Sequence, residues 1–239
     1  MRMDGQRIVI FGGTGDFGIT TAKAALAIGA EVVIASPSPD KVKDAAESLG
    51  KGATGLVADV NDDQALARAF KELGAVDHVA MTVGGPIKAR GLAPVEDAKT
   101  VFETRFWGQY RVARAAAEKL YTAKSLTFTS GASSVRPLYG ALLGSMLNAT
   151  VDSMTRVMAT QLGPMRVNSV APGVIDSNQL RLVLPQAERE AFFAKLADTL
   201  PTARPGRSEE IAKAFLFLMD NSYMTGTTVY VDGGALLAA

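Results

Sequence analysis

Three glycines near the start of the chain have the spacing of a phosphate-binding turn. The apolar run 7–11 leads directly into Gly12, Gly15 and Gly18, and an alanine-rich run of helical period follows. Glycines let the backbone turn tightly and approach a phosphate, and the free N–H groups at a helix N-terminus attract its negative charge. This order predicts a turn that holds the pyrophosphate of a dinucleotide. The residues alone leave open a tight strand-to-helix turn without a ligand.

Other reactive side chains are scarce. The chain has no cysteine and a single histidine, His78, which excludes disulfides, thiolate nucleophiles and cysteine-ligated zinc. A Ser-His-Asp hydrolase would have to use His78, and the residues around it are typical of a turn that enters a buried strand. The sequence therefore predicts neither a hydrolase nor a metal site.

The charge of the chain is nearly balanced. Lys and Arg number 25 and Asp and Glu number 24, which gives a net charge of +1, so no strong field attracts nucleic acid or anionic lipid. The start of the chain lacks the uncharged run of a secretory signal, and no stretch is apolar for the ~20 residues of a membrane span. We expect a cytoplasmic protein without nucleic-acid or membrane partners.

The elements that position the glycine turn follow a regular alternation. Short β-branched runs alternate with longer alanine-rich segments, which is typical of βαβ units. This pattern predicts an α/β fold, a Rossmann-type doubly wound sheet of about seven parallel strands with helices on both faces. Strands are expected at 7–11, 31–35, 54–58, 78–83, 125–129, 166–170 and 228–231, and helices at 17–28, 39–48, 62–71, 95–119, 145–162 and 208–220.

The length of the chain suits one domain. Its 239 residues lie within the range of a single α/β domain, so one dinucleotide-binding domain is predicted over 1–239. Residues 177–207 break the alternation, because three prolines surround an amphipathic segment at 188–200. We interpret 177–207 as a substrate lid inserted into this domain.

Further motifs follow the later strands in order. They are Asp59-Val60, Thr82-Val83-Gly84-Gly85, the run from Val167 to Gly173, the run from Arg204 to Ala212, and the end of the chain from Thr225 to Gly234. Over nearly its whole length the chain resembles the short-chain dehydrogenase/reductase family, which implies an NAD(P)-dependent oxidoreductase. The predicted cofactor-binding residues are Gly12, Thr14, Gly15, Asp16, Phe17, Gly18, Ser36, Ser38, Lys41, Asp59, Val60, Thr82, Val83, Gly84, Pro172, Gly173, Val174, Ile175 and Ser177.

The end of the second strand favours NADP(H) over NAD(H). An NAD enzyme usually has a carboxylate here to bond the ribose hydroxyls, but this chain has Ser36 followed by Pro37. No carboxylate repels a 2′-phosphate, and Ser36, Ser38 and Lys41 could hold one. The alternative is that these residues form only a polar turn and the start of a helix.

The catalytic positions depart from the family pattern. Members of the family carry a Tyr and a Lys one helical turn apart, and the resemblance places them at Gly144 and Asn148. No tyrosine of the chain has a lysine one helical turn after it. The family's Asn falls on Arg105, and its Ser falls on Gly131 or the neighbouring Ser130. The active site is therefore predicted to be non-standard.

Two candidate catalytic groups are charged or acidic. Tyr139 could bring its phenol to a substrate carbonyl, or could pack at a subunit contact instead. Arg105 could polarise a carbonyl oxygen or hold a carboxylate, since a guanidinium stays charged and donates to two oxygens. The alternative for Arg105 is an ion pair with Glu103 or Asp152.

Two neutral candidates complete the set. Ser130 could hydrogen-bond an oxyanion or cap the end of its strand, and Asn148 could bond the nicotinamide ribose. The leading hypothesis is an NADP(H)-dependent oxidoreductase that acts on a carbonyl or imine of a small, partly apolar substrate. The alternative is a catalytically inactive dinucleotide-binding sensor or partner subunit, and the resemblance implies a homodimer or homotetramer in either case.

Overall fold

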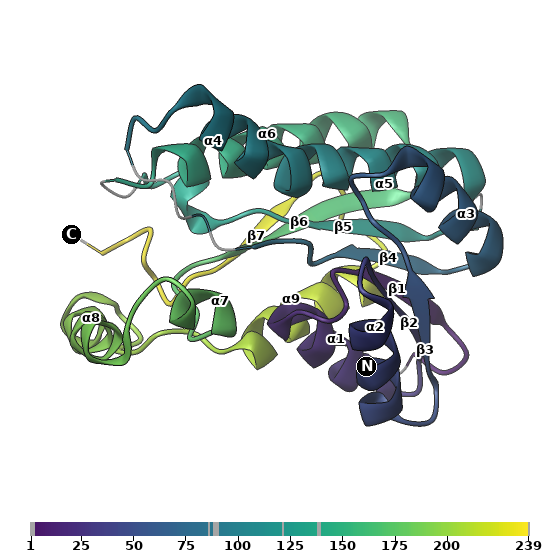
Figure 1. Ribbon diagram of the computed structural model, residues 1–239, viewed down its shortest axis with the longest axis horizontal. Coiled ribbons are helices and arrows are strands. Elements are labelled where there is room, and N and C mark those ends of the chain that lie inside the picture. Colours follow the sequence, from purple (N-terminus) through teal and green to yellow (C-terminus); the bar gives the residue numbers. More distant parts are fainter. Residues whose placement is uncertain (1–2, 86, 88–90, 121, 138–139, 239) are drawn as a thin grey trace.

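A single parallel sheet forms the centre of the molecule (Figure 1). The computed structural model describes residues 3–85, 87, 91–120, 122–137 and 140–238. In this part of the chain seven strands lie in the order β3-β2-β1-β4-β5-β6-β7, which confirms the predicted doubly wound sheet. The strands are β1 (Arg7–Phe11), β2 (Glu31–Ser36), β3 (Ala53–Val57), β4 (His78–Met81), β5 (Ser125–Thr129), β6 (Arg166–Pro172) and β7 (Thr228–Val231).

The direction of strand addition reverses beside β1. The chain first builds outward through β2 and β3, and then crosses to β4 on the other side of β1. Ile8 of β1 accordingly pairs with both Val32 of β2 and His78 of β4. At such a reversal the loops after the neighbouring strands separate to opposite faces, which leaves a crevice where doubly wound sheets bind their ligands.

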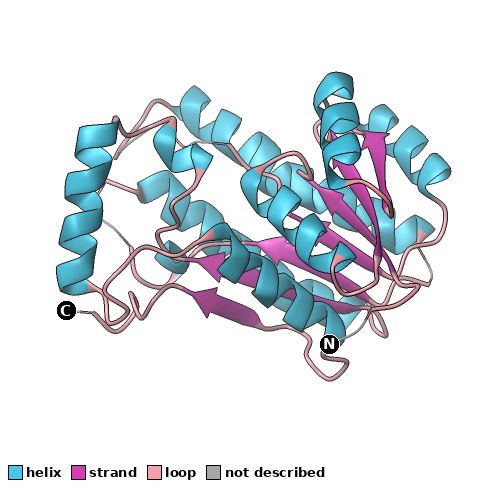
Figure 2. Ribbon diagram, turned by 90° about the horizontal axis from the view of Figure 1, so that it is seen from below, coloured by secondary structure: helices cyan, strands magenta, loops and turns pink. Residues whose placement is uncertain are grey.

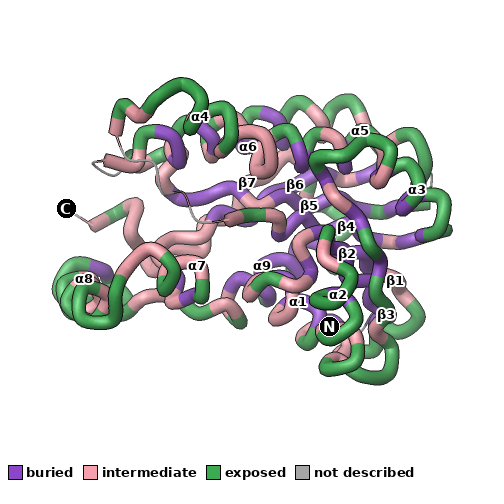
Figure 3. The backbone as a smooth tube through the Cα atoms, in the orientation of Figure 1, coloured by how far each residue is buried: buried purple, intermediate pink, exposed green. Residues whose placement is uncertain are grey.

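Helices cover both faces of the sheet (Figure 1). Phe11, Phe70 and Phe128 belong to the core on one face, and Ile10 and Phe215 belong to the core on the other. Figure 3 shows the buried strands between the two helical layers. One layer contains α1 (Asp16–Leu26), α2 (Pro39–Leu49) and α9 (Ser208–Asp220), and the other contains α3 (Asp63–Leu73), α4 (Val95–Phe102), α5 (Gly108–Lys119) and α6 (Leu142–Gln161).

The structure is helical from 95 to 119, as predicted, but the helix contains a π-helical turn that the sequence did not predict. Between α4 and α5 the segment Glu103–Trp107 forms a π-helical turn, η1, in which the N–H of Gly108 bonds the carbonyl of Glu103. Gly108 packs so closely on Val60 that a Cβ here would lie 2.7 Å from Val60 Cγ2. Such wide turns are frequent at functional sites because they redirect the side chains that follow.

The predicted lid region, 177–207, contains two helices. These are α7 (Asn178–Arg181) and α8 (Gln186–Thr199), and α8 covers most of the amphipathic segment at 188–200. None of the residues of α8 is buried, and the helix stands to one side of the sheet in both Figure 1 and Figure 2. In the described part of the chain, no helix has the length and apolar character to cross a membrane.

Candidate functional site

The glycine turn packs too tightly for any side chain at two of its positions. A Cβ on Gly18 would lie 2.6 Å from Gly13 Cα, and a Cβ on Gly12 would lie 2.7 Å from the backbone nitrogen of Val83. Gly12 also has a φ of 80°, which favours glycine. The turn therefore brings the backbone after β1 directly against the start of α1 and against the turn after β4.

The N-terminus of α1 faces the outside of this turn. Gly15 is the N-cap and offers no side-chain acceptor, so the first N–H groups of α1 keep their donors for a ligand. Beside it lies a pocket of about 510 Å³, where Thr14, Gly15 and Asp16 meet Ser177 and Asn178 of the lid region. This cradle of bare backbone and free N–H groups fits the phosphates of a dinucleotide.

The first residue of α1 also holds the lid region. Both carboxylate oxygens of Asp16 accept hydrogen bonds from Asn178, one from its backbone N–H and one, at 2.6 Å, from its side-chain Nδ2. Ser177 caps α7 by accepting from the N–H of Leu180. The start of the predicted lid region is thus tied to the glycine turn, a contact that sequence reasoning missed because the two residues are far apart in the chain.

The residues predicted to choose between NAD(H) and NADP(H) lie after β2. Ser36 is 7% exposed, and its hydroxyl accepts a 2.9 Å hydrogen bond from Thr14 of the glycine turn. Ser38 caps α2 by accepting from the N–H of Lys41, whose own side chain is exposed. Ser36 retains its hydroxyl proton for a ligand, and no carboxylate occupies its position.

The turns after β3 and β4, both predicted to contact the cofactor, lie at the same edge of the sheet. Asp59 stabilises the turn after β3 by accepting from the N–H of Asn61, and Val60 is buried under η1. Thr82 donates to the carbonyl of Phe11 and so joins the turn after β4 to β1. The carboxyl ends of β1, β3 and β4 therefore bring these predicted residues to one crevice.

The turn after β6 completes this edge. A Cβ on Gly173 would lie 2.7 Å from Asp232 Cα, so the turn at Pro172 and Gly173 packs against the chain that follows β7. Asp232 in turn accepts from the N–H groups of Gly234 and Leu236 and fixes the C-terminal segment. Val174 and Ile175 continue from this turn into the lid.

Arg105 projects from η1 to the turn after β4. Its Nη2 donates to the carbonyl of Gly85 and, at 3.2 Å, to Oε1 of Gln179 in α7. A Cβ on Gly84 would lie 3.4 Å from Nη2, so this glycine leaves room for the guanidinium. The ion-pair alternative for Arg105 is not seen, because Glu103 pairs with Arg111 at 2.6 Å.

A buried amide holds the backbone of Arg105 against the end of β5. Gln109 is 1% exposed. Its Nε2 donates to the carbonyl of Arg105 at 2.5 Å and to that of Thr129 at 3.2 Å, while its Oε1 accepts from the N–H of Thr129 at 3.1 Å. Sequence reasoning missed Gln109, although a glutamine on the buried face of a helix was a signal for such a clamp.

Ser130 and Asn148 are bonded to each other and to the loop after β5. The Ser130 hydroxyl donates to the carbonyl of Asn148 at 3.1 Å, and Asn148 Nδ2 donates to Ser133 Oγ at 3.0 Å. Asn148 Cγ would lie 3.0 Å from a Cβ on Gly131, so the amide fills the space that this glycine leaves. Gly144 is buried and supplies no functional group.

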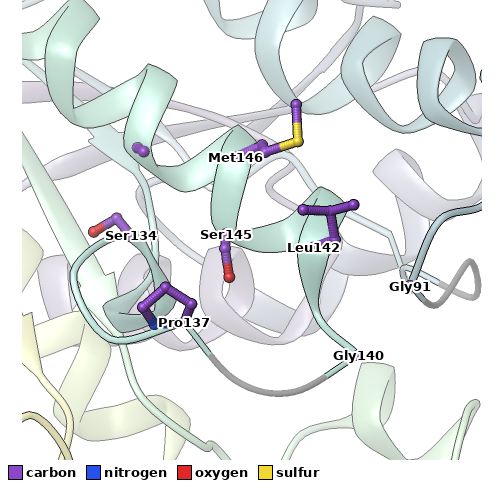
Figure 4. A pocket seen from close by; sticks show the side chains of 8 residues that line it. Gly91, Ser134, Pro137, Gly140, Leu142, Ser145 and Met146 are labelled. Carbon is purple, nitrogen blue, oxygen red and sulfur yellow. The ribbon is translucent and has the colours of Figure 1, made fainter.

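An apolar pocket opens beside the start of α6. It measures about 460 Å³ and lies between this helix and the loops after β4 and β5 (Figure 4). Tyr139, the fourth predicted catalytic residue, lies outside the described residues. The described lining residues are Gly91, Ser134, Pro137, Gly140, Leu142, Ser145, Met146 and Ala149.

The single histidine lies at the opposite, amino-terminal edge of the sheet. His78 begins β4, and its ring nitrogens bond Ser125 Oγ at 2.8 Å and Gln6 Oε1 at 2.7 Å. Burial lowers the pKa of His78 to about 4. His78 is therefore a structural residue, and the described residues include no cluster of metal-ligating side chains.

Comparison with known proteins identifies the family of this chain. Residues 15–235 match the sequence family described as Enoyl-(Acyl carrier protein) reductase. A short-chain dehydrogenase/reductase of Acremonium sp is 30% identical, with 99% of this chain and 97% of that protein covered. The chain belongs to the short-chain dehydrogenase/reductase family. It is therefore an NAD(P)-dependent oxidoreductase by family, as the resemblance implied.

Two further relatives cover almost the whole chain. A protein named carbonyl reductase family member 4, from Danio rerio, is 28% identical over 96% of this chain and 97% of its own length. A solved small-chain dehydrogenase in complex with NADPH is 29% identical, has a TM-score of 0.78, and matches 98% of this chain and 100% of that chain. The short-chain dehydrogenase/reductase fold is thus present from end to end.

Proposed function

We propose that this short-chain dehydrogenase/reductase uses NADPH to reduce a carbonyl or imine of a small, partly apolar substrate, or NADP⁺ to oxidise the corresponding alcohol or amine, at a non-standard active site. The observation that carries the proposal is the contact of Arg105 with Gly84 and Gly85, the turn predicted to meet the cofactor. A charged donor thereby lies at the same crevice as the phosphate turn. Bound in this crevice, NADP(H) supplies or accepts the hydride.

The chain's own residues have distinct tasks in this proposal. The backbone at Gly12, Gly15 and the start of α1 binds the phosphates, and the turn at Pro172 and Gly173 holds the nicotinamide end. Ser130 and Asn148 are engaged with each other, which supports a role in orienting the loop after β5. Gly144 cannot donate a proton, so the proton reaches the substrate from water, from Tyr139 or from the substrate itself.

An iminium substrate suits this set of residues well. Its nitrogen already carries the positive charge, so hydride addition at carbon needs no strong acid at nitrogen. The loss of the family's Tyr and Lys from Gly144 and Asn148 therefore matters least for this substrate. A carbonyl substrate would need Tyr139 or water as the acid, and unchanged turnover in Tyr139→Phe would remove that residue from the role.

The preference for NADP(H) rests on the residues after β2. Ser36 keeps a hydroxyl proton to donate to a phosphate oxygen, and Lys41 is exposed nearby on α2. A carboxylate in place of Ser36 would repel the 2′-phosphate. The likeness to a solved dehydrogenase that holds NADPH agrees with this preference.

The substrate's apolar body is proposed to occupy the crevice between the lid and the apolar pocket at α6. Gln179 connects the lid to Arg105, and Asp16 connects it to the phosphate turn. Phe192 and Phe193 of α8 are only half-buried, so they are available to a bound substrate. In this proposal, 177–207 is a substrate lid on a single domain.

A homodimer or homotetramer is proposed from the exposed side of α5 and α6. Trp107 is 45% exposed, Tyr110 is 38% exposed and Met146 is 50% exposed, and aromatic side chains and methionine are enriched at protein interfaces. The cytoplasmic location stays a prediction from the sequence.

The test of this function is direct transfer of label. The full chain is incubated with NADPH deuterated at C4 and with matched panels of ketones, aldehydes and cyclic iminium ions, and deuterium in the products is measured by mass spectrometry. We expect transfer to at least one class, lost when the glycine turn is disrupted by Gly18→Ala. Tight NADPH binding without transfer to any of the three substrate classes would contradict the proposal and favour a sensor or partner subunit.

A further inference from the structure

The guanidinium of Arg105 has donors that the protein does not use. Only Nη2 makes hydrogen bonds, to Gly85 and Gln179. Nε and Nη1 have no hydrogen-bond partner among the described residues. Three of the five N–H donors of this side chain are therefore unused by the described part of the protein.

No carboxylate neutralises this cation within the described part of the chain. Glu103 lies on the same turn but pairs with Arg111, and Asp152 accepts from Thr228 at 3.2 Å. Burial lowers the pKa of Arg105 to about 10, so the side chain still carries its charge at neutral pH. A buried charge is costly unless it is paired, and the two carbonyl oxygens at Nη2 supply dipoles but no opposite charge.

The position of Arg105 points to the substrate rather than to the cofactor phosphates. The phosphate turn lies at the start of α1, whereas Arg105 contacts the turn after β4 and Gln179 of the lid. Gly84 packs beside the guanidinium, where a Cβ would lie 3.4 Å from Nη2. An anion held here would lie between the turn after β4 and α7.

We propose that Arg105 binds a carboxylate of the substrate, so that the enzyme acts on a carbonyl or imine compound that carries an anionic group. This inference rests on the proposed function for the reaction, and adds the charge of the substrate. Of the two roles open to Arg105, polarising a carbonyl oxygen or holding a carboxylate, we favour the second. A neutral carbonyl oxygen would leave the buried charge of Arg105 unpaired. Arg105 then acts as a specificity-determining residue.

The first test follows the side-chain N–H resonance of Arg105 in the ¹⁵N-labelled full chain with NADP⁺ present. The resonance is identified by its loss in Arg105→Lys. We expect benzoate to shift it, and benzamide or sodium chloride at the same ionic strength to leave it unchanged. Equal shifts with benzamide, or no shift with benzoate, would overturn the proposal.

Two variants make the test quantitative. In Arg105→Gln, benzoate binding should weaken roughly 10- to 100-fold, the range of a lost charge-assisted hydrogen bond. In Arg181→Gln it should not change, because Arg181 is exposed and already pairs with Asp176 at 3.2 Å. Similar weakening in both variants would mean that benzoate binding depends only on the net charge of the protein, which would contradict a specific contact with Arg105.

A third variant supplies the missing anion from the protein. Gln179→Glu puts a carboxylate beside Nη2, where Oε1 now lies 3.2 Å away, and we expect it to abolish the benzoate shift of Arg105 while Gln179→Met preserves it. These binding measurements need no turnover. If benzoate shifts the Arg105 resonance but no deuterium is transferred, the proposed reaction is rejected. If deuterium is transferred but benzoate causes no shift, only the binding of a substrate carboxylate by Arg105 is rejected.

Discussion

The substitution Gly18→Ala tests the packing of the phosphate turn. The new Cβ would lie 2.6 Å from Gly13 Cα, whereas carbon atoms pack best at about 3.5–4.0 Å. The start of α1 must therefore move by roughly 1 Å. Such overpacking costs about 1–3 kcal/mol, less the gain of up to about 1 kcal/mol from alanine in a helix. For a net cost of about 1–2 kcal/mol, we expect Tm to fall by roughly 2–8 °C and NADPH affinity to fall at least tenfold.

The matched control is Gly15→Ala in the same turn. Its Cβ would lie 3.4 Å from the carbonyl oxygen of Gly12, an ordinary contact, and its φ of −85° suits alanine. The small N-cap cost and the reduced entropy of the unfolded chain nearly cancel, so Tm should change little. Tm is read by calorimetry and affinity by the fluorescence of bound NADPH. Wild-type Tm and affinity in Gly18→Ala, or equal destabilisation by both variants, would refute this reasoning.

Three further predictions concern stability and the lid. Burial lowers the pKa of His78 from 6.5 to about 4, so as pH falls the unfolded chain takes up this proton before the folded chain does. The free energy of unfolding should therefore drop by up to about 3 kcal/mol between pH 6.5 and pH 4. When urea unfolding is measured at a series of pH values, the free energy of unfolding should depend less on pH in His78→Gln than in the wild type. Arg166→Met removes hydrogen bonds to the carbonyls of Leu218, Met219 and Met224 and should cost about 2–4 kcal/mol in urea unfolding, whereas a cost under about 0.5 kcal/mol would show that water replaces them. Asp16→Ala breaks both bonds to Asn178 and should speed hydrogen exchange at α7 without changing that of β1; unchanged exchange at α7 would show that the lid is held elsewhere.

The fold could be predicted because its signals are local. The β-branched run before Gly12 and the helical period after Gly18 fix the first strand, turn and helix by hydrophobic period alone. Repetition of this pattern along the chain then determines a parallel sheet, since each strand needs a crossover helix. The cofactor turns follow, because they are the loops at the carboxyl ends of these strands.

The chemistry of the site could not be predicted in the same way. Gly108, directly after η1, packs against Val60, and Arg105 contacts Gly85 and Gln179. Each of these contacts joins segments that only the folded chain brings together. Residue type and spacing identified Arg105 as a candidate, but its unpaired charge is a property of the tertiary structure.

The most direct test of the central claim is a parallel titration of the full chain with NADPH and NADH, followed by nicotinamide fluorescence. We predict that both bind in the same crevice and that NADPH binds more tightly, because Ser36 offers a hydroxyl where an NAD enzyme has a carboxylate. Tighter binding of NADH would contradict the cofactor preference alone. Binding of neither would contradict the central claim, and the glycine turn would then be only a structural turn.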